Sequence, residues 1–354
     1  MLPVPVRFAV VVSSLASLLG CTKEAIPTLQ PAVPTPAATT FTNPLLSSGP
    51  DPWVAQKDGF YYFVATNDRN LTIRKTAKMS ELGTAYSTVV WTPAASGGNV
   101  RHLWAPELYW LDGKWYLYYT AGSSTGGCCA SQRLWVLENP SPDPTTGTWT
   151  EKGQLLSAGH DYSAIDATVL ELGSQRYLLW CGVESTTNSE GRLYISALRN
   201  PWTLTGPRTE ISRPTYDWER KGPPTNEGPE VLQHNGRTFV TYSASHCMTD
   251  DYALGLLTLT GSDPLDAASW TKSARPVFTQ NPTGKAFGPG HNGFFKSKDG
   301  TQDWLLYHAN SLAGQGCGDL RSPRIQPITW RADGTPDFGV PAAVGQPLPR
   351  PAGE

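Results

Sequence analysis

Turn dipeptides ending in glycine recur through this chain at nearly constant intervals. The successive turn glycines are 54, 60, 63 and 64 residues apart. Each turn joins two strand-like segments rich in aromatic and β-branched residues, and a third such segment follows with room for a fourth. A supersecondary unit is therefore repeated five times. The turns are Asp58-Gly59, Asp112-Gly113, Leu172-Gly173, Asn235-Gly236 and Asp299-Gly300.

The repeat predicts an all-β protein, a five-bladed β-propeller in which four-stranded sheets surround a central axis. The chain has no long run of apolar residues at helical spacing, so little helix is expected. A β-sandwich would not explain the fivefold recurrence, and the period of a hexapeptide β-helix is far shorter. The 34 Gly and 31 Pro suit many short strands joined by tight turns. A chain of 354 residues can form one all-β domain of this kind.

Three carboxylates stand shortly before the turns of the first, third and fourth units. Asp51 precedes its turn glycine by eight residues, Asp166 by seven and Glu227 by nine. A radial arrangement of the units would bring these side chains together at one end of the axis. Cleavage of a glycosidic bond requires a pair of carboxyl groups on opposite sides of that bond. The pattern therefore indicates a glycoside hydrolase.

The N-terminal part of the chain reads as an export signal followed by a tether. Arg7 precedes an apolar run over residues 8–19 that is too short to span a bilayer comfortably. The run ends in Leu-Leu-Gly-Cys, so residues 1–21 are predicted to be a lipoprotein-type signal peptide with an acylated Cys21. An ordinary secretory signal that happens to contain a cysteine is the alternative. Residues 22–41 are expected to form an extended linker rich in Pro, Ala and Thr, and residues 42–354 the propeller.

The remaining cysteines and the net charge narrow the classes of partner. An exported protein can form disulfides. Because five cysteines remain, at least one of them cannot be paired with another of the five. Their spacing fits no zinc motif, so no metal is assigned to them. The net charge is −2 without a basic cluster, which disfavours nucleic acid. Contact with a membrane is expected only through the lipid anchor on Cys21. The cysteines are Cys128, Cys129, Cys181, Cys247 and Cys317.

Ten stretches, in this order and spacing, resemble glycoside hydrolase family 43, and within it the exo-acting α-L-arabinofuranosidases. The resemblance runs from about Thr42 to Val344. The stretches are GPDPWV (49–54), LWAPELYWLDGKWYLYY (103–119), AIDATVLEL (164–172), NPWTLTGPR (200–208), PTYDWE (214–219), NEGPEVL (226–232), DDYALGLLT (250–258), FGPGHNGFF (287–295), DWLLYHAN (303–310) and WRADGTPDFG (330–339).

The resemblance implies a role for each of the three carboxylates. Asp51 matches the general base, and Glu227 matches the general acid, with Glu230 as its competitor. Asp166 matches a third carboxylate that orients the sugar and raises the pKa of the acid by like-charge repulsion. The family inverts at the anomeric carbon, for which a separation of roughly 6.5–9.5 Å between base and acid leaves room for water. Ala167 stands where the resemblance often leads one to expect glycine. This difference would alter the surface of the pocket beside Asp166.

The resemblance also points to residues that bind substrate. Trp104 is expected to line the sugar pocket, with core packing as the alternative, and Glu107 in the same motif reads as structural. Arg321 can reach sugar hydroxyls with its forked donors, and Arg324 is its competitor. His291 is expected near the axis, beside water or a cation such as calcium. No organic cofactor is required.

These features together predict an exported, inverting enzyme that releases terminal α-L-arabinofuranosyl residues from plant cell-wall arabinan or arabino-oligosaccharides. A β-xylosidase or an endo-arabinanase on the same three acids is the alternative among enzymes. A propeller that only binds glycans is the alternative from another class. The presence of all three acids argues against it.

Overall fold

The structure is a computed structural model that describes residues 1–5, 9, 40–127 and 129–354. The apolar run of the predicted signal peptide, Cys21 and nearly all of the predicted linker lie outside the described residues. Regular structure begins with β1 (Thr40–Thr42), and residues 39–354 form one compact unit. Among the described residues, no helix is both long and apolar enough to cross a membrane.

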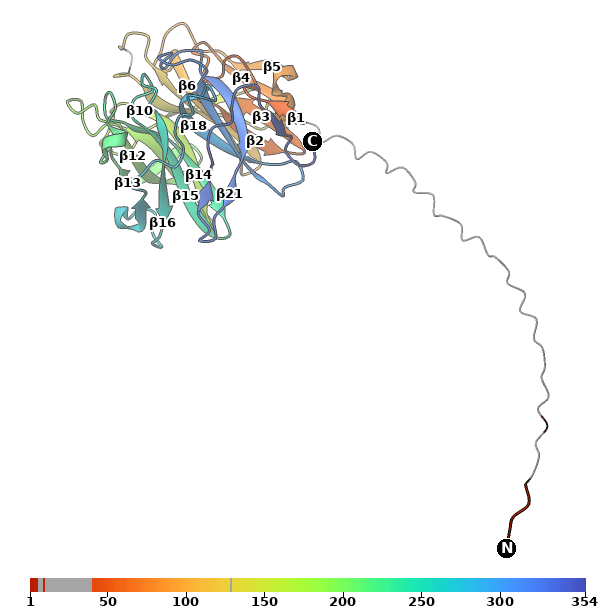
Figure 1. Cartoon of the computed structure of the whole chain (residues 1–354). Coiled ribbons are helices and arrows are strands. Elements are labelled where there is room, and N and C mark those ends of the chain that lie inside the picture. Colours follow the sequence, from red (N-terminus) through yellow and green to blue (C-terminus); the bar gives the residue numbers. More distant parts are fainter. Residues whose placement is uncertain (6–8, 10–39, 128) are drawn as a thin grey trace. The chain divides into compact units, whose positions relative to one another are not determined.

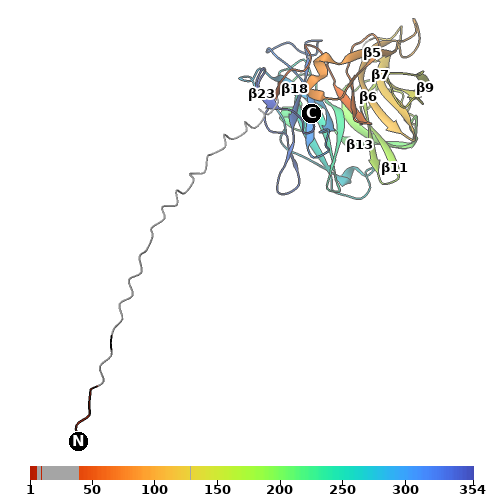
Figure 2. The ribbon, with the colours of Figure 1, turned by 90° about the vertical axis from the view of Figure 1, so that its right-hand side faces the viewer.

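Five antiparallel sheets follow one another along the chain, which confirms the predicted five-bladed β-propeller (Figures 1 and 2). Within each blade the strands pair in chain order. Helix in the described residues is limited to the 3-10 turns Met79–Thr84, Asp217–Glu219 and Ala267–Ser269. The blades comprise, in order, β2 (Trp53–Lys57), β3 (Phe60–Val64), β4 (Leu71–Thr76) and β5 (Tyr86–Trp91); β6 (Arg101–Leu111), β7 (Lys114–Gly122), β8 (Arg133–Asn139) and β9 (Thr150–Leu155); β10 (Ala164–Leu172), β11 (Gln175–Gly182), β12 (Arg192–Asn200) and β13 (Thr203–Ser212); β14 (Asn226–His234), β15 (Arg237–Ala244), β16 (Ala253–Leu259) and β17 (Trp270–Lys272); and β18 (Phe287–Lys296), β19 (Asp303–Asn310) and β20 (Ser322–Pro327).

The predicted glycine turns join the first two strands of every blade. All five turn glycines have φ between 59° and 78°, a left-handed conformation that glycine adopts without steric cost. The preceding Asp58, Asp112 and Asn235 also have positive φ. Two consecutive left-handed residues make the two-residue hairpin turn whose twist matches that of the strands. The repeat in the sequence is therefore a repeat of hairpins.

The fifth blade differs from the prediction because it has three strands. Two short strands that follow it, β21 (Thr329–Trp330) and β22 (Pro336–Asp337), pair with each other, and proline there cannot donate to a ladder. The outer edge of β20 instead meets the segment that leads into the first blade. The amide of Leu45 donates to the Pro323 carbonyl at 2.9 Å, and the amide of Gly49 donates to the Arg321 carbonyl at 3.1 Å. β1 pairs with β23 (Pro347–Pro349), so both ends of the domain meet here.

The core consists of five apolar layers, each between two adjacent blades. One layer joins blades one and two, where the rings of Tyr62 and Trp115 lie 5.3 Å apart. The next three layers continue around the ring. The last joins blade five back to blade one, where Phe295 lies 5.6 Å from Tyr61. The innermost strands β2, β6, β10, β14 and β18 contact one another in the same cyclic order.

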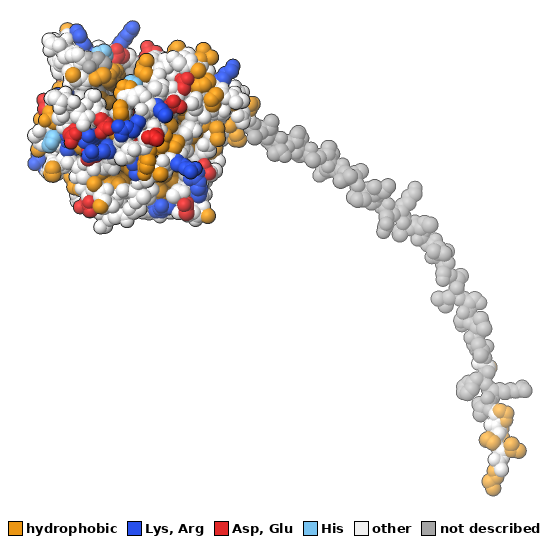
Figure 3. All heavy atoms as spheres, turned by 60° about the vertical axis from the view of Figure 1, so that its left-hand side comes forward, with side chains coloured by type: hydrophobic (Ala, Val, Ile, Leu, Met, Phe, Trp, Pro, Cys, Tyr) orange, Lys and Arg blue, Asp and Glu red, His pale blue; other side chains and the backbone are white. Residues whose placement is uncertain are grey.

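The outer surface carries charges of both signs. On the face of the propeller drawn in Figure 3, basic side chains lie beside acidic ones, with apolar side chains scattered among them. Ion pairs of this kind include Arg176 with Asp112 and Arg331 with Asp337. Exposed pairs add little to stability, so the inter-blade layers dominate the packing energy.

Candidate active site

Each innermost strand has a residue with positive φ at or near its start, and β6 and β18 have a second one at His102 and Gly288. Five of these residues lie at or beside positions that line the central cavity. These residues are Asp51 (φ 52°), Ala105 (42°), Asp166 (59°), Gly228 (52°) and His291 (41°). The pairing register shifts beside the last four of them. A bulge of this kind re-aims side chains. The propeller thus has a positive-φ residue at the start of all five blades and combines it with a bulge in four of them.

All six residues predicted to form the site line a single cavity of about 290 Å³. The cavity therefore unites contributions from all five blades. Five further residues complete the lining, and sequence reasoning did not assign them to the site. The predicted residues are Asp51, Trp104, Asp166, Glu227, His291 and Arg321; the others are Cys129, Ile165, His246, Cys247 and Cys317.

Asp51 is held as an anion. Arg321 Nη1 donates to its Oδ1 at 2.6 Å, and the Thr66 hydroxyl donates to Oδ2 at 2.8 Å. His291 Nδ1 lies 3.3 Å from Oδ1, and the Asp51 amide donates to His308 Nδ1 at 3.0 Å. Burial alone would raise the pKa of Asp51, but Arg321, both histidines and the Thr66 hydroxyl hold that pKa well below its ordinary value. Asp51 therefore has the charge state required of a base.

Glu227 is held as an acid. Burial raises the pKa of its carboxyl to about 7, although the hydrogen bond from Tyr252 opposes this shift and the charge of Asp51 adds to it. The Tyr252 hydroxyl donates to Glu227 Oε1 at 2.8 Å. The predicted base and the predicted acid thus lie in one cavity, where the first favours its ionised form and the second its protonated form. Acid–base catalysis needs one group in each of these states.

Asp166 lies between blades three and four. Its Oδ2 accepts from the amide of Gly228 at 3.0 Å, and its own amide donates to Thr120 Oγ1 at 3.1 Å. Burial, followed by the charges of Glu227 and Asp51, raises the pKa of Asp166 well above its ordinary value. Asp166 and Glu227 therefore repel each other when both are ionised, and burial is the largest cause of the raised pKa of each.

Glu230, the competitor for the acid, does not line the cavity. It accepts from Trp53 Nε1 at 3.0 Å and from Thr168 Oγ1 at 3.3 Å. Glu107 belongs to the same buried cluster, where Tyr109 donates to it. Burial raises the pKa of Glu230 to about 8, and burial with the charge of Glu230 raises that of Glu107 well above its ordinary value. This carboxyl pair links β6 and β14 apart from the cavity lining, in agreement with a structural role for Glu107.

Arg321 and Arg324 have different surroundings. Arg324 is fully buried and donates to the Lys285 carbonyl at 3.0 Å and to Ser311 Oγ at 3.0 Å. Those contacts tie loops together away from the carboxylates. Arg321 instead faces the cavity and pairs with Asp51. The geometry therefore favours Arg321 as the arginine within reach of a sugar.

Trp104 presents an oriented indole at the cavity wall. Its Nε1 donates to Asp68 Oδ1 at 3.1 Å, and the ring of His102 lies 5.5 Å from its own. Trp104 is only partly buried, so core packing does not account for it. Aromatic faces with a fixed orientation offer broad contact area at low entropic cost, which suits the apolar face of a sugar.

A second cavity of about 470 Å³ adjoins the first on the side of Glu227. The two cavities share Cys129, Ile165 and Glu227. The second one extends past Tyr162 toward residues 182–191 of blade three. Glu227 is therefore the one predicted carboxylate that faces both spaces.

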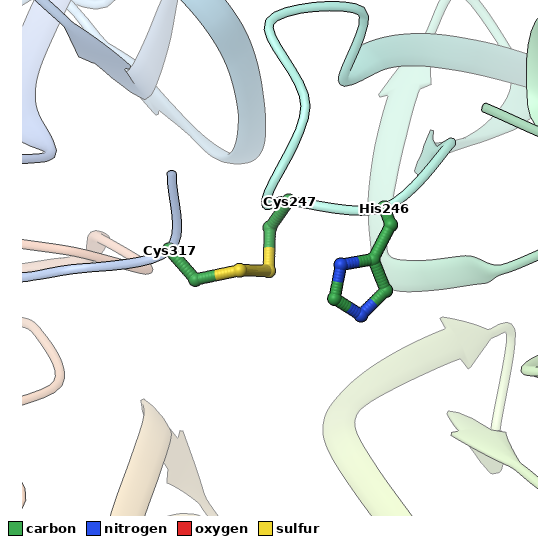
Figure 4. A group of neighbouring side chains, drawn as sticks. All are labelled: His246, Cys247 and Cys317. Atoms are coloured by element: carbon green, nitrogen blue, oxygen red, sulfur yellow. A yellow bond between two sulfur atoms is a disulfide. The ribbon is translucent and has the colours of Figure 1, made fainter. Parts of the chain in front are cut away.

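The side chains at the cavity provide few free ligands for a metal ion. Among the described residues, one close group combines metal-binding side-chain types: His246, Cys247 and Cys317 (Figure 4). Cys247 and Cys317 form a disulfide, so their sulfurs are not available as thiolate ligands. Calcium takes six to eight oxygen ligands, and the carboxylate that contacts His291 is already paired with Arg321. The donor set beside His291 does not fit calcium.

Comparisons with known proteins place the chain in a family. The sequence profile described as Glycosyl hydrolases family 43 matches residues 41–336. The chain belongs to this family, which confirms the resemblance seen in its motifs, and it is a glycoside hydrolase.

The chain is similar to named members over most of its length. It is 42% identical to an extracellular exo-alpha-(1->5)-L-arabinofuranosidase of Streptomyces avermitilis, over 96% of this chain and 70% of that protein. It is 43% identical to a protein of the same name from Streptomyces chartreusis, over 80% and 86%. The crystal structure of an alpha-L-arabinofuranosidase from Lactobacillus brevis superposes with a TM-score of 0.81 at 37% identity, over 86% of this chain and 98% of that one.

Proposed function

We propose that this enzyme releases terminal α-L-arabinofuranosyl residues from arabinan or arabino-oligosaccharides with inversion at the anomeric carbon. One observation carries the proposal: Asp51 and Glu227 line the same cavity with pKa values shifted in opposite directions. The similarity to arabinofuranosidases over most of the chain supports the choice of sugar.

In the proposed reaction, Asp51 takes a proton from a water molecule that attacks the anomeric carbon. Glu227 gives its proton to the glycosidic oxygen as the bond to the leaving group breaks. Arg321 keeps Asp51 ionised at every working pH and presents its remaining donors to the sugar. Asp166, held by the Gly228 amide, offers its carboxyl group to a sugar hydroxyl. Trp104 contacts the sugar face.

The leaving group is proposed to occupy the second cavity. A general acid must reach the glycosidic oxygen, so the leaving group lies on the side of Glu227. The cavity of about 470 Å³ adjoins that side and is within the size range of small-ligand sites. The cavity that contains Asp51 is then left for the terminal sugar.

The test is a comparison of three substrates: an aryl α-L-arabinofuranoside, an aryl β-D-xyloside and debranched arabinan. The arabinofuranoside should be cleaved well, arabinan should release arabinose alone, and the first product should have the inverted anomeric configuration. Mixed arabino-oligosaccharides from the start would mean an endo enzyme. Preference for the xyloside would overturn the choice of sugar, and binding without turnover would mean a glycan-binding propeller.

The proposed reaction needs no cofactor. Calcium or another cation near the axis is compatible with the sequence, but Asp51 beside His291 is engaged by Arg321. Enzyme treated with EDTA and then dialysed should therefore retain full activity on the aryl arabinofuranoside. A loss that added calcium restores would show that a cation is bound elsewhere in the chain.

The proposed place of action is outside the cytoplasm, where polymeric arabinan occurs. Two relatives are named extracellular, and the sequence carries an export pattern ahead of Cys21. A lipid anchor on Cys21 is the more specific proposal. A labelled fatty acid should mark the native protein, and Cys21→Ser should abolish the label. An unlabelled protein with a mature N-terminus elsewhere would mean plain secretion.

A further inference from the structure

Two loops form one side of the active-site cavity, and each ends in a residue that holds a reacting carboxyl group. The loop over residues 245–252 lies between β15 and β16 and ends in Tyr252, which donates to Glu227 at 2.8 Å. The loop over residues 311–321 lies between β19 and β20 and ends in Arg321, which donates to Asp51 at 2.6 Å. The positions of the acid and the base thus depend on two neighbouring loops from different blades.

A disulfide joins these two loops within the cavity wall. Cys247 and Cys317 are bonded with their Cα atoms 5.1 Å apart, and both line the cavity (Figure 4). The carbonyl of Gly318, directly after Cys317, accepts from Arg321 Nε at 3.2 Å and from the Arg321 amide at 3.3 Å. The covalent link is therefore one residue from the group that aims the guanidinium at Asp51.

A second link crosses between the same loops. Both carboxylate oxygens of Asp250 accept from the amide of Gly314, at 2.9 and 3.1 Å. The Asp250 carbonyl also accepts from the amide of Gly288 on β18. The first loop is thus tied to blade five through Asp250 as well as through the disulfide.

We propose that the Cys247–Cys317 disulfide is a positioning element of the active site, which clamps the two loops so that Arg321 and Tyr252 hold the base and the acid in their reactive arrangement. The cysteines touch neither reacting atom in this role and act through those two residues. The inference rests on the proposed function, since the activity it predicts to change is arabinofuranoside cleavage.

The first experiment compares the full chain with a Cys247→Ala/Cys317→Ala double variant. We expect kcat/KM on the aryl arabinofuranoside to fall by about 10- to 100-fold, the scale of misplacing reacting groups by a fraction of an ångström to an ångström. The matched control is Leu320→Ala, because Leu320 is exposed in the same loop and should leave kcat/KM unchanged. Circular dichroism checks that both variants keep their strands.

The pH profile of kcat/KM distinguishes a positioning role of the disulfide from a role in stability alone. A loosened Arg321 would let the pKa of Asp51 rise, and a loosened Tyr252 would let that of Glu227 rise, because both contacts favour the ionised carboxylate. Both limbs of the kcat/KM profile should therefore move to higher pH in the double variant. The groups that act on these carboxyls in the wild type are Arg321, His291, His308, Thr66, Tyr252, Asp166 and the two carboxyls themselves.

A second variant keeps the proposal testable if the double variant does not fold. Asp250→Ala leaves the disulfide in place and removes the other link, so both limbs should move in the same direction by a smaller amount. Its control is Asp251→Ala, an exposed neighbouring carboxylate. A folded double variant with an unchanged profile, or an unchanged profile in Asp250→Ala, would overturn the proposal. If the wild type does not cleave the arabinofuranoside, the proposed function has failed instead.

Discussion

At the scale of single residues, the proton balance of the cavity sets its working pH. The proposed base, Asp51, must be ionised to act, and its depressed pKa keeps it ionised down to acidic pH. The proposed acid, Glu227, must be protonated to act, and its pKa of about 7 means that this form is lost as pH rises through 7. We expect kcat/KM to stay level through about pH 4, where an ordinary aspartate would already be half protonated, and to fall about tenfold per unit well above pH 7.

The Tyr252 hydroxyl offers a test of whether Glu227 sets the alkaline limb of the kcat/KM profile. The Tyr252 hydroxyl stabilises the ionised form of Glu227, so Tyr252→Phe should raise the pKa of the acid and move the alkaline limb to higher pH. Tyr61→Phe is the matched control, because that hydroxyl donates to the Lys296 carbonyl. A limb that does not move in Tyr252→Phe would mean that another group titrates there.

The two reacting carboxyls should respond differently to removal. Asp51→Ala should remove nearly all turnover on every substrate, because no leaving group replaces the base. Glu227→Ala should lose about 10²–10⁴-fold on arabinan, yet far less on an aryl substrate whose phenol leaves with little proton assistance. Rates on both substrates for both variants test this. Leaving-group dependence in Glu230→Ala in place of Glu227→Ala would contradict the assignment of the acid.

At the scale of elements, left-handed residues in the innermost strands help to set which backbone groups and side chains face the cavity. In blade four such a residue is Gly228, whose amide donates to Asp166 and whose added Cβ would lie 3.2 Å from the His291 ring. Gly228→Ala should lower the free energy of unfolding by about 1–2 kcal/mol from backbone strain. It should also reduce kcat severalfold, because both Asp166 and His291 must shift.

A matched glycine separates strain from function in this element. Gly236 lies in the exposed turn of the same blade at φ 74°, and a Cβ there would meet nothing within 4 Å. Gly236→Ala should cost a similar free energy of unfolding and leave kcat unchanged. Urea unfolding and steady-state kinetics on both variants decide the point. Equal kinetics in the two variants would show that the blade-four irregularity is only structural.

At the scale of the whole molecule, the blades were predictable because each begins with a hairpin whose glycine turn can be recognised in the sequence. The meeting of three carboxylates in one cavity was predictable because these residues recur in phase with those turns. Tyr252 was not, because one tyrosine among 14 carries no local mark of what it will face. The Cys247–Cys317 pair was not, because several pairings were open. The three-stranded fifth blade depends on a long-range partner that no local pattern reveals.

That partner is the segment before the first blade, and it closes the ring. The buried Asn43 side chain donates to the Ile325 carbonyl at 2.8 Å and accepts from the Ile325 amide at 3.0 Å, as a neighbouring strand would. Asn43→Ala would leave both backbone groups of Ile325 unpaired in the interior, at about 1–3 kcal/mol for each. The free energy of unfolding in urea should fall accordingly.

Turnover per folded molecule at 25 °C should not change in Asn43→Ala, because the cavity lies at the axis and Asn43 lies at the outer edge of blade five. Asn67→Ala is the control: it removes an exposed asparagine whose side-chain hydrogen bonds reach no further along the chain than Thr72. Asn67→Ala should therefore unfold within about 0.5 kcal/mol of the wild type, as surface substitutions usually do. If Asn43→Ala proved no less stable than Asn67→Ala, the ring would have to be closed by the β1–β23 pair and the apolar layer between blades five and one.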